Sequence, residues 1–441
     1  MSHYKPYPAY CPSGVEWIGD VPSTWEVKRL RQVASFKNSG IDKKSYEGQE
    51  QVSLCNYTDV YYNEFITADM PFMQATASKD EILQFTLKKG DLIITKDSED
   101  PSDIGIPALV VEDAPGVVCG YHLTLIRAAE IDAARLLHRA LQSPPTHAYF
   151  YVESPGITRY GLGQDVIGDL RICVPPKSEI GRIADCTDRE TKRIDSLIAK
   201  KTRFIDLLKE KRQALITHAV TKGLDPHVKT RDSGDDWIKE IPVTWKSMKF
   251  GRIARVTEGL VDPRDEPYRS MVLIAPNHIE SGTGRLIQLE TAAEQNAESG
   301  KYQCRAGNVV YSKIRPALAK VVIAPCDGLC SADMYPLDCT ELVEPEWLFY
   351  LMLSTSFTAW AILESDRVAM PKINRESLFE LGVHVPPKDE QRRVVAFISA
   401  SVLKSDALLS KTQHSIDLLK ERRFAFITAA VTGQIDLREA T

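Results

Sequence analysis

The sequence has no long apolar run. The longest, Trp347–Leu353, has seven residues in a chain of 441, whereas a helix that crosses a membrane needs about 18 or more. Residues 1–14 hold three prolines and no apolar core, so we expect no signal peptide there. The sequence therefore predicts a protein without membrane spans and with no membrane partner.

Paired cysteines are also missing. The nine cysteines are scattered and odd in number, which favours a reducing cytoplasm over a disulfide-bonded fold. Cys326, Cys330 and Cys339 lie near one another but lack the C-x-x-C spacing of a structural zinc site. We expect buried thiols at these positions and no metal.

The common catalytic motifs are absent as well. There is no Walker loop, no H-E-x-x-H and no G-x-S-x-G. Ser143-Pro144-Pro145 weakly resembles the loop of amino-methyltransferases, but Thr146 stands where that loop has an aromatic residue, and Gly161-Leu162-Gly163 has no third glycine in phosphate-binding register. These absences favour a binding protein, although a missing motif does not exclude an enzyme.

The net charge of -5 argues weakly against a nucleic-acid binder. Binding to phosphates depends on where charge lies, however, and not on its sum. The segment Arg189–Arg212 has nine basic and four acidic residues. That run is either a phosphate-binding surface or an ordinary solvated helix face.

The chain does contain a long repeat. Residues 174–224 recur at 385–435 with a constant offset of 211 and no gap. An insertion would rotate every later side chain off its helical face, so an ungapped repeat indicates one structural element used twice. Each copy opens with Val-Pro-Pro, contains no further proline, and ends near Gly223 or Gly433. Proline in the first turn and glycine at the end are typical of a helix, here of about 44 residues and about 65 Å.

Apolar residues in both copies recur at steps of three, four or seven, which is the pattern of a pairing stripe. A helix with one apolar stripe needs a partner, and the other copy is the obvious one. Two unrelated surface helices, each packed on its own domain, are the alternative. The residues expected to pair the helices or dock partners are Ile194, Ile198, Ile205, Leu208, Leu215, Val402, Leu409, Ile416, Leu419 and Phe426.

A second repeat precedes each helix. Trp17, Pro22 and Trp25 match Trp237, Pro242 and Trp245 at an offset of 220, and we expect the tryptophans to anchor each domain to the helices. The residues between this opening and the helix differ in the two halves and look like mixed α/β domains. Strands are expected at 92–94, 108–112, 123–127, 309–311 and 320–324, and helices at 133–142 and 346–364.

Polar residues follow equivalent strands and precede each Val-Pro-Pro. Arg and Lys can donate to guanine or phosphate, Asp and Glu can accept from cytosine, and Gln and Asn can recognise adenine. An ordinary exposed loop is the alternative for any one of them. The candidate DNA contacts are Lys96, Asp97, Ser98, Glu99, Tyr160, Gln164, Ser312, Lys313, Arg315, Lys372, Asn374 and Arg375. Lys96 and Arg315 are expected to face the major groove.

The chain contains the same series of features twice: the motif Trp-Ile-x-x-Val/Ile-Pro-x-x-Trp, a variable domain, the motif Val-Pro-Pro-x-x-Glu, and a long helix with Ile-Asp-Leu-Leu-Lys-Glu. This repeated series resembles the specificity (S) subunit of type I restriction–modification enzymes. The resemblance implies two target-recognition domains, each for half of a bipartite DNA sequence. It also implies helices that set the spacer and dock two methyltransferase subunits, through which restriction subunits join. The chain itself would carry no chemistry, and S-adenosylmethionine, ATP and Mg would belong to its partners.

The expected fold class is therefore α/β: two mixed α/β target-recognition domains separated by two long antiparallel, coiled-coil-like helices, with a pseudo-two-fold internal repeat. A two-fold protein contacts half-sites commonly about 34–36 Å apart, and divergent middles predict an asymmetric target. The alternatives are a fused restriction or methylation enzyme, and a helical scaffold without DNA specificity. The expected parts are a first domain at 1–177, a helix at 178–222, a linker at 223–236, a second domain at 237–388, a helix at 389–432 and a tail at 433–441.

Overall fold

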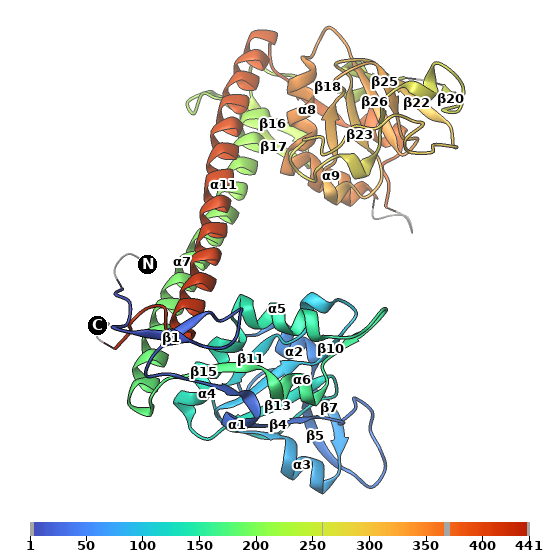
Figure 1. Ribbon diagram of the computed structural model, residues 1–441. Coiled ribbons are helices and arrows are strands. Elements are labelled where there is room, and N and C mark those ends of the chain that lie inside the picture. Colours follow the sequence, from blue (N-terminus) through green and yellow to red (C-terminus); the bar gives the residue numbers. More distant parts are fainter. Residues whose placement is uncertain (1–3, 258, 366–370, 439–441) are drawn as a thin grey trace. The chain divides into compact units, whose positions relative to one another are not determined.

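A computed structural model of the chain describes residues 4–257, 259–365 and 371–438. The chain divides into two compact units (Figure 1). Unit 1 comprises residues 1–201 and 414–441, and unit 2 comprises residues 202–413. Each unit therefore contains one α/β domain together with half of each long helix, a division that the expected domain boundaries did not include.

The two long helices are α7 (Lys177–Lys222) and α11 (Lys388–Val431). Their ends lie within one residue of the expected bounds. In unit 1 the first half of α7 shares a core with the end of α11, and in unit 2 the second half of α7 shares a core with the start of α11, so the helices run antiparallel. Buried residues of the stripe are Ile194, Ile416 and Phe426, and the half-buried ones are Ile198, Ile205, Leu208, Leu215, Val402, Leu409 and Leu419.

Unit 1 contains two larger sheets. The larger has, in spatial order, β4 (Ala34–Asn38), β13 (Leu123–Ala128), β9 (Asp91–Thr95), β11 (Pro107–Val110) and β6 (Phe65–Ile66). The smaller has β7 (Met73–Ala77), β5 (Glu50–Cys55), β12 (Ala114–Cys119) and β8 (Thr86–Leu87). The short helices are α1 (Leu30–Val33), α2 (Tyr57–Tyr62), α3 (Lys79–Phe85), α4 (Ile131–Leu141), α5 (Pro144–Glu153) and α6 (Gln164–Asp169).

Unit 2 repeats this arrangement with fewer strands. One sheet has the order β19 (Ala254–Val256), β26 (Met334–Cys339), β23 (Val309–Ser312) and β24 (Val321–Ile323). The other has β20 (Leu260–Val261), β22 (Lys301–Cys304), β25 (Gly328–Cys330) and β21 (Leu273–Ile274). The helices are α8 (Pro345–Leu353), α9 (Thr355–Ser365) and α10 (Arg375–Glu380). The divergent middles of the sequence therefore adopt related folds.

The central strands β9 and β23 are buried on both faces. Leu92 and Ile94 pack in the core that includes α4, while Ile93 packs in the core of the smaller sheet. Val309 and Val310 divide in the same way. Successive side chains of a strand point to opposite faces, so each domain is a layer of helices on one sheet with a second sheet behind it.

The prediction of one helix at 346–364 is wrong in one respect, because the structure has two helices there, α8 and α9. Ser354 is extended (φ -66°, ψ 151°) and breaks the run between α8 and α9. Its hydroxyl accepts a hydrogen bond from the N–H of Phe357 at 3.2 Å, which is the role of an N-cap serine. Ser143 lies between α4 and α5 at the equivalent position and is buried, so Ser143-Pro144-Pro145 is a helix junction.

The second tryptophan of each repeat lies where the two long helices meet. In unit 1, Nε1 of the buried Trp25 donates to Glu179 at 3.4 Å, in the first turn of α7. Gly433, which follows α11, lies beside the same indole. In unit 2, Trp245 donates to Glu390 of α11 at 3.1 Å and lies beside Gly223. Each indole therefore joins the start of one long helix to the end of the other.

The first tryptophans pack on their own domains. Trp17 contacts Tyr149 of α5, with ring centroids 6.3 Å apart. Nε1 of Trp237 donates to the carbonyl of Gly382 at 3.0 Å, and its ring meets Phe357 of α9. The expected anchoring to the long helices therefore holds for Trp25 and Trp245 but not for Trp17 and Trp237.

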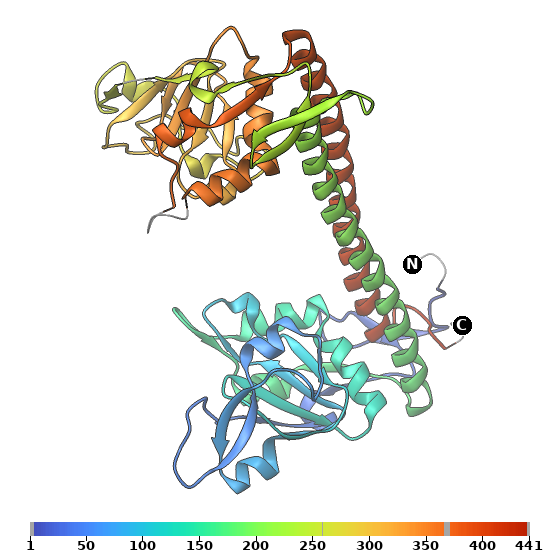
Figure 2. The same ribbon diagram turned by 180° about the vertical axis from the view of Figure 1, so that it is seen from behind.

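Two connecting segments are more ordered than expected. The stretch 223–236, expected as a linker, contains β16 (Thr230–Asp235), which pairs with β17 (Ile238–Pro242) beside the long helices (Figure 2). In the described part of the tail, Ile435 and Leu437 are buried in the core of unit 1. Further two-stranded antiparallel sheets are β1 (Tyr10–Pro12) with β2 (Asp20–Pro22), β3 (Glu26–Arg29) with β15 (Arg171–Val174), and β18 (Lys246–Lys249) with β27 (Gly382–Val385). Among the described residues, no helix is long and apolar enough to cross a membrane.

Charged residues also tie the long helices to the first domain. Arg423 of α11 pairs with Asp195 of α7 at 2.9 Å and with Glu64 at 2.5 Å. Arg139 of α4 reaches Glu64 at 2.5 Å and Asp188 of α7 at 2.8 Å. Burial raises the pKa of Glu64, but Arg139 and Arg423 outweigh burial and hold that pKa below its usual value.

We expect Gly433→Ala to destabilise the protein more than Gly14→Ala. Both glycines have positive φ, +71° and +74°, so alanine costs about 1–2 kcal/mol at either site. A Cβ on Gly433 would lie 2.4 Å from Pro22, whereas nothing lies within 4 Å of one on Gly14. The clash adds about 1–3 kcal/mol. Urea unfolding of the two variants measures the difference, and equal losses would contradict this account of the junction.

We expect Glu64→Gln to cost about 2 kcal/mol at pH 7, because it weakens hydrogen bonds between charged groups. The pKa of Glu64 is lowered in the folded state, so its contribution is present above the unfolded pKa and is lost as the pH falls through the folded pKa. The stability difference between wild type and Glu64→Gln should therefore shrink below about pH 4.5. Urea unfolding from pH 7 to pH 3.5 tests this, with Glu153→Gln, at an exposed glutamate of α5, as the control variant.

Candidate nucleic-acid interface

The polar loops begin where the central strands end. After β9, the N–H of Lys96 donates to the carbonyl of His122 at 2.9 Å. After β23, the N–H of Lys313 donates to the carbonyl of Asp333 at 3.0 Å. Lys96 and Lys313 are therefore structural counterparts. Lys96 and Arg315 lie on loops at equivalent strand ends, as expected, with Arg315 two residues beyond the counterpart of Lys96.

In each unit this loop pairs antiparallel with the segment that precedes Val-Pro-Pro, and we call this pairing the strand crossing. In unit 1, β10 (Asp97–Ser98) pairs antiparallel with β14 (Tyr160–Gly161). In unit 2, Ile314 forms an antiparallel bridge with Lys372, and the N–H of Arg315 donates to the carbonyl of Pro371 at 3.1 Å. The two stretches singled out separately in each half of the sequence thus form one surface in each unit.

Asp97 is the centre of the polar cluster in unit 1. It forms an ion pair with Lys96, and its Oδ2 lies 2.9 Å from Nδ1 of His122. Arg159 lies against the same imidazole, with Nη2 2.7 Å from Nδ1 and 3.0 Å from Nε2. Burial raises the pKa of Asp97, but hydrogen bonds from Lys96 and His122 outweigh it and hold that pKa below its usual value. The carboxylate is therefore ionised at neutral pH and holds the loop together.

Both strand-end lysines lie over aromatic rings. Nζ of Lys96 is 5.0 Å from the ring centroid of Tyr121, and Nζ of Lys313 is 5.5 Å from that of Tyr335. Tyr335 is itself fixed, since its hydroxyl donates to the carbonyl of Ile373 at 3.1 Å. Cation–π contacts of this kind hold an ammonium group in place, so each lysine is positioned by its own unit.

The candidate residues differ in how accessible they are. Ser312 is buried (3% exposed), and its hydroxyl donates to the carbonyl of Ile314, so it cannot contact a ligand directly. The half-buried candidates are Lys96, Asp97, Ser98, Tyr160, Lys313 and Arg375, and the exposed ones are Glu99, Gln164, Arg315, Lys372 and Asn374. Arg315 has positive φ (49°), a conformation that is uncommon for a residue other than glycine and is often found at binding loops.

Sequence reasoning missed several neighbours of this surface. His122 and Arg159 join the Asp97 cluster from segments 25 and 62 residues away, and nothing local in the sequence indicates that they meet. Tyr57, Tyr61 and Tyr62 of α2 also lie near it. Tyr57 stacks on Tyr61 with centroids 5.6 Å apart and approaches Ser98 at 3.5 Å, and Tyr62 is 77% exposed. The tyrosines within residues 57–62 were the feature of the sequence that could have indicated this part of the surface.

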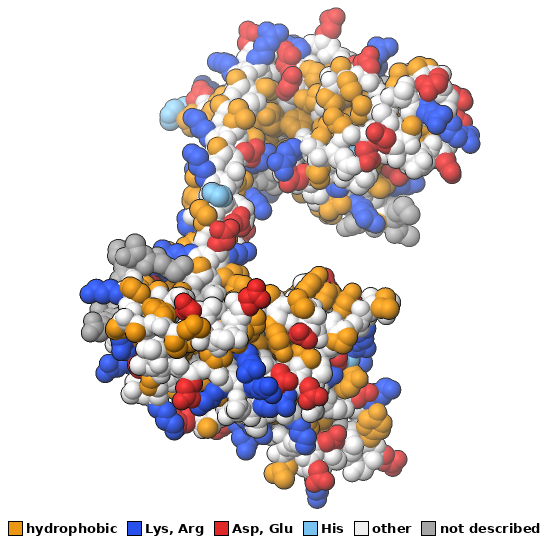
Figure 3. Space-filling model, in the orientation of Figure 1, with side chains coloured by type: hydrophobic (Ala, Val, Ile, Leu, Met, Phe, Trp, Pro, Cys, Tyr) orange, Lys and Arg blue, Asp and Glu red, His pale blue; other side chains and the backbone are white. Residues whose placement is uncertain are grey.

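Charge is mixed on the surface. Figure 3 shows acidic and basic side chains interspersed, with no continuous basic face on the side drawn. Among residues 4–257, 259–365 and 371–438, no group of three or more His, Cys, Asp or Glu could hold a metal ion. Cys330 is buried and Cys339 half-buried, while Cys326 is exposed; all three are free thiols.

Comparison with known proteins places the chain in a family. Residues 242–417 match the model described as the type I restriction modification DNA specificity domain. The chain is 30% identical over 301 residues to the type I restriction enzyme EcoDI specificity subunit of Escherichia coli, and the match covers 63% of this chain and 67% of that one. The EcoBI specificity subunit of the same organism is 21% identical over 309 residues, 65% of each chain. The chain belongs to the type I restriction enzyme specificity subunits.

Solved structures support the fold of this specificity subunit. A chain described under "Structural basis underlying complex assembly and conformational transition of the type I R-M system" aligns with a TM-score of 0.68 and 16% identity, over 94% of this chain and 99% of that chain. The HsdS subunit from Thermoanaerobacter tengcongensis aligns with a TM-score of 0.52 and 16% identity, over 94% and 98%. The expected fold class, two α/β domains with two long antiparallel helices, is confirmed.

We expect Gly161→Ala to open the strand crossing in unit 1. A Cβ at Gly161 would lie 2.9 Å from Oδ1 of Asp97, whereas nothing lies within 4 Å of one at Gly163. The N–H of Leu162 donates to the carbonyl of Lys96 at 2.8 Å, so its hydrogen exchange reports on the crossing. Exchange should become about tenfold faster in Gly161→Ala, as for a loss of about 1.4 kcal/mol. It should stay unchanged in Gly163→Ala, and unchanged exchange in both variants would show that the crossing tolerates the added carbon.

Proposed function

We propose that this specificity subunit recognises a bipartite, asymmetric DNA sequence, with one half contacted by each unit. The observation that carries the proposal is the strand crossing found in both units. The same backbone arrangement presents different side chains in each, and a family role in DNA specificity requires such a difference. Ser98, Glu99, Tyr160 and Gln164 lie on the surface of unit 1, and Arg315, Lys372, Asn374 and Arg375 lie on that of unit 2.

These side chains suit base recognition. Arginine and lysine donate to O6 and N7 of guanine, glutamine and asparagine pair with adenine, and glutamate accepts from the cytosine amino group. Unit 2 presents mainly cations and unit 1 presents a mixture of carboxylate and amide. The two half-sites should therefore differ in base composition.

Partner subunits would supply most of the phosphate contacts and the catalytic chemistry. The net charge is -5, which favours methyltransferase subunits as the source of most phosphate contacts. Several apolar side chains on the long helices are exposed rather than paired, which supports docking of two methyltransferase subunits and, through them, restriction subunits. They include Leu197, Phe204, Leu207, Phe397, Leu403, Leu408, Leu418 and Phe424. On this proposal the chain is not an enzyme, and S-adenosylmethionine, ATP and Mg bind to its partners.

The decisive experiment is co-expression with the methyltransferase subunit, followed by mapping of methylated bases in the host DNA. A bipartite, asymmetric motif with an unmethylated gap is expected, and deletion of this chain should abolish methylation at that motif. If methylation persists at the same motif without the chain, the chain does not choose the sequence. A helical scaffold would then be the better interpretation.

We expect Arg315→Ala to relax specificity in one half-site only. An arginine bound to a guanine edge is worth about 1–3 kcal/mol of discrimination, which corresponds to about 5–150-fold. Gln164→Ala is the matched variant, because it should alter only the other half-site. Methylation rates on a set of substrates with single base changes measure both effects. An equal loss on all substrates, with a weaker salt dependence, would make Arg315 a phosphate contact.

A further inference from the structure

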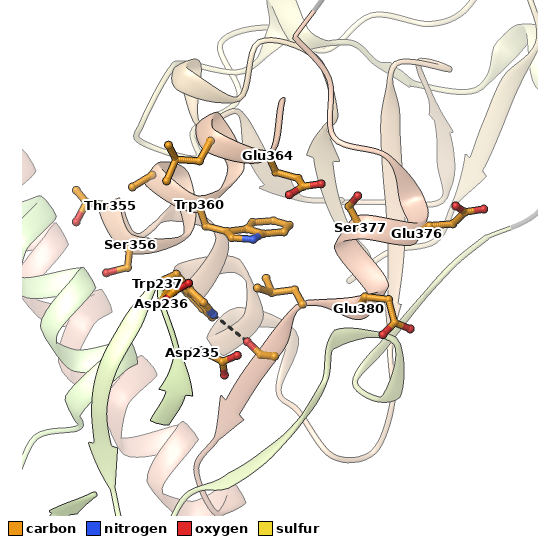
Figure 4. Close-up of a pocket in the computed structure, with 14 residues that line it drawn as sticks. Asp235, Asp236, Trp237, Thr355, Ser356, Trp360, Glu364, Glu376, Ser377 and Glu380 are labelled. Carbon is orange, nitrogen blue, oxygen red and sulfur yellow. Dashed lines mark hydrogen bonds between the residues drawn. The ribbon is translucent and has the colours of Figure 1, made fainter. Parts of the chain in front are cut away.

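A cleft of about 940 Å³ opens in unit 2 between α9, α10 and the β16–β17 hairpin. Its lining includes none of the candidate DNA-contacting residues, although Glu376 directly follows Arg375 in α10. Figure 4 shows the indole of Trp360 projecting from α9 across the cleft, with Trp237 below it and Glu364 above it. The hydrogen bond from Trp237 to Gly382, at 3.0 Å, fixes the second indole. The cleft therefore has a rigid aromatic floor.

The rim of the cleft is acidic. Among the residues that the structure describes, its lining includes Asp235, Asp236, Glu364, Glu376 and Glu380, and no lysine or arginine. Asp235 is 3.1 Å from the buried His384, and Glu380 is 3.4 Å from Lys249 at the surface. No described residue forms an ion pair with Glu376. Carboxylates around the half-buried indoles of the cleft favour a cation and repel phosphate.

In unit 1, the residues equivalent to Glu376 and Glu380 pair with an arginine side chain. Asp165 and Asp169 of α6 hold the positions of Glu376 and Glu380, at the offset of 211. Nη2 of Arg31 lies between them, 3.6 Å from Asp165 and 3.3 Å from Asp169. A guanidinium group of unit 1 itself therefore bridges the acid pair there.

Unit 2 lacks that guanidinium. Gly251 holds the place of Arg31, since the residues just before them, Leu30 and Phe250, donate equivalent backbone hydrogen bonds of 2.8 Å. The space beside Gly251 is taken by Phe379, whose own counterpart in unit 1 is Gly168. Arg31 and Gly168 of unit 1 are thus replaced by Gly251 and Phe379 in unit 2. The acid pair of unit 2 has therefore lost the guanidinium that bridges it in unit 1, and Lys249 pairs with Glu380 alone.

The aromatic residue at the equivalent position of unit 1 joins two helices through a hydrogen bond. Tyr149 holds the place of Trp360 at the same offset. Its hydroxyl donates to the carbonyl of Val166 in α6 at 3.0 Å, which joins α5 to α6. An indole at that position leaves α9 and α10 unjoined by such a bond, so the cleft of unit 2 stays open.

We propose that this acidic, aromatic cleft of unit 2 binds an arginine-bearing segment of a partner protein. The guanidinium would lie on the indole of Trp360, in the role that Arg31 has in unit 1, with Glu376 and Glu380 as its carboxylate partners. Arginine suits the site because its planar cation stacks on aromatic rings and pairs with carboxylates through two hydrogen bonds. Leu363, 72% exposed on the cleft wall, adds apolar surface for a neighbouring side chain, which a free small cation would not use.

The test uses the full-length chain labelled with 5-fluorotryptophan and the peptide acetyl-Gly-Arg-Gly-Arg-Gly-amide. Titration should shift the ¹⁹F resonances of Trp360 and Trp237 with saturation, as assigned by Trp360→Phe and Trp237→Phe. The paired variant Glu376→Gln/Glu380→Gln should weaken binding about tenfold, since two partly exposed ion pairs are lost. Asp165→Asn in unit 1 is the matched control and should leave the affinity unchanged.

Five results would overturn the proposal. The citrulline version of the peptide, which has the same shape without the charge, could bind as tightly. The Glu376→Gln/Glu380→Gln variant could bind the arginine peptide as tightly as wild type, or no saturable shift could occur at all. Guanidinium ion binding as tightly as the peptide would make this a site for a small cation rather than a protein segment, and a DNA duplex shifting the same two resonances would make the cleft part of the DNA surface.

Discussion

A buried indole hydrogen-bonded to a glutamate in the first turn of a long helix is the contact on which each unit depends. Trp25 bonds Glu179, Trp245 bonds Glu390, and the other long helix ends beside each indole at a glycine with positive φ. A Cβ at Gly433 would lie 2.4 Å from Pro22, and one at Gly223 would lie 2.9 Å from the carboxylate of Glu390. The contact fixes the register of one helix against the other within each unit, and so it determines which apolar residues of the stripe are buried.

The central strand of each domain then positions the functional loop. Since β9 and β23 are buried on both faces, neither strand can shift by one residue without moving its side chains into the wrong core. The residues just beyond the strand end carry no such constraint. That division explains how a repeated scaffold can carry dissimilar surfaces: Asp97 organises a charged cluster in unit 1, whereas Ile314 takes the equivalent position in unit 2.

The two units also differ where their domains meet the helices. Arg423 pairs with Asp195, and Arg212 pairs with Asp406 at the same offset of 211. In unit 1, Glu64 and Arg139 extend this pair into the domain. In unit 2, Arg212 instead reaches the carbonyl of Thr283 at 3.4 Å. The repeated pair belongs to the helices, and each domain has added its own contacts to it, as it has at the cleft between α9 and α10.

The amino-acid sequence by itself determined the elements whose signals are periodic or local. The long helices, their stripe, the capping glycines and the paired tryptophans follow from an ungapped repeat, because helical periodicity is a property of neighbouring residues. Only the tertiary structure decided that Lys96 aligns with Lys313, that Ser312 is buried, and that residues 97–98 cross residues 160–161. Those outcomes depend on strands that pair across dozens of intervening residues, and no local pattern encodes which strands pair. His122 and Arg159 joined the candidate site for the same reason, since long-range packing brings them to Asp97.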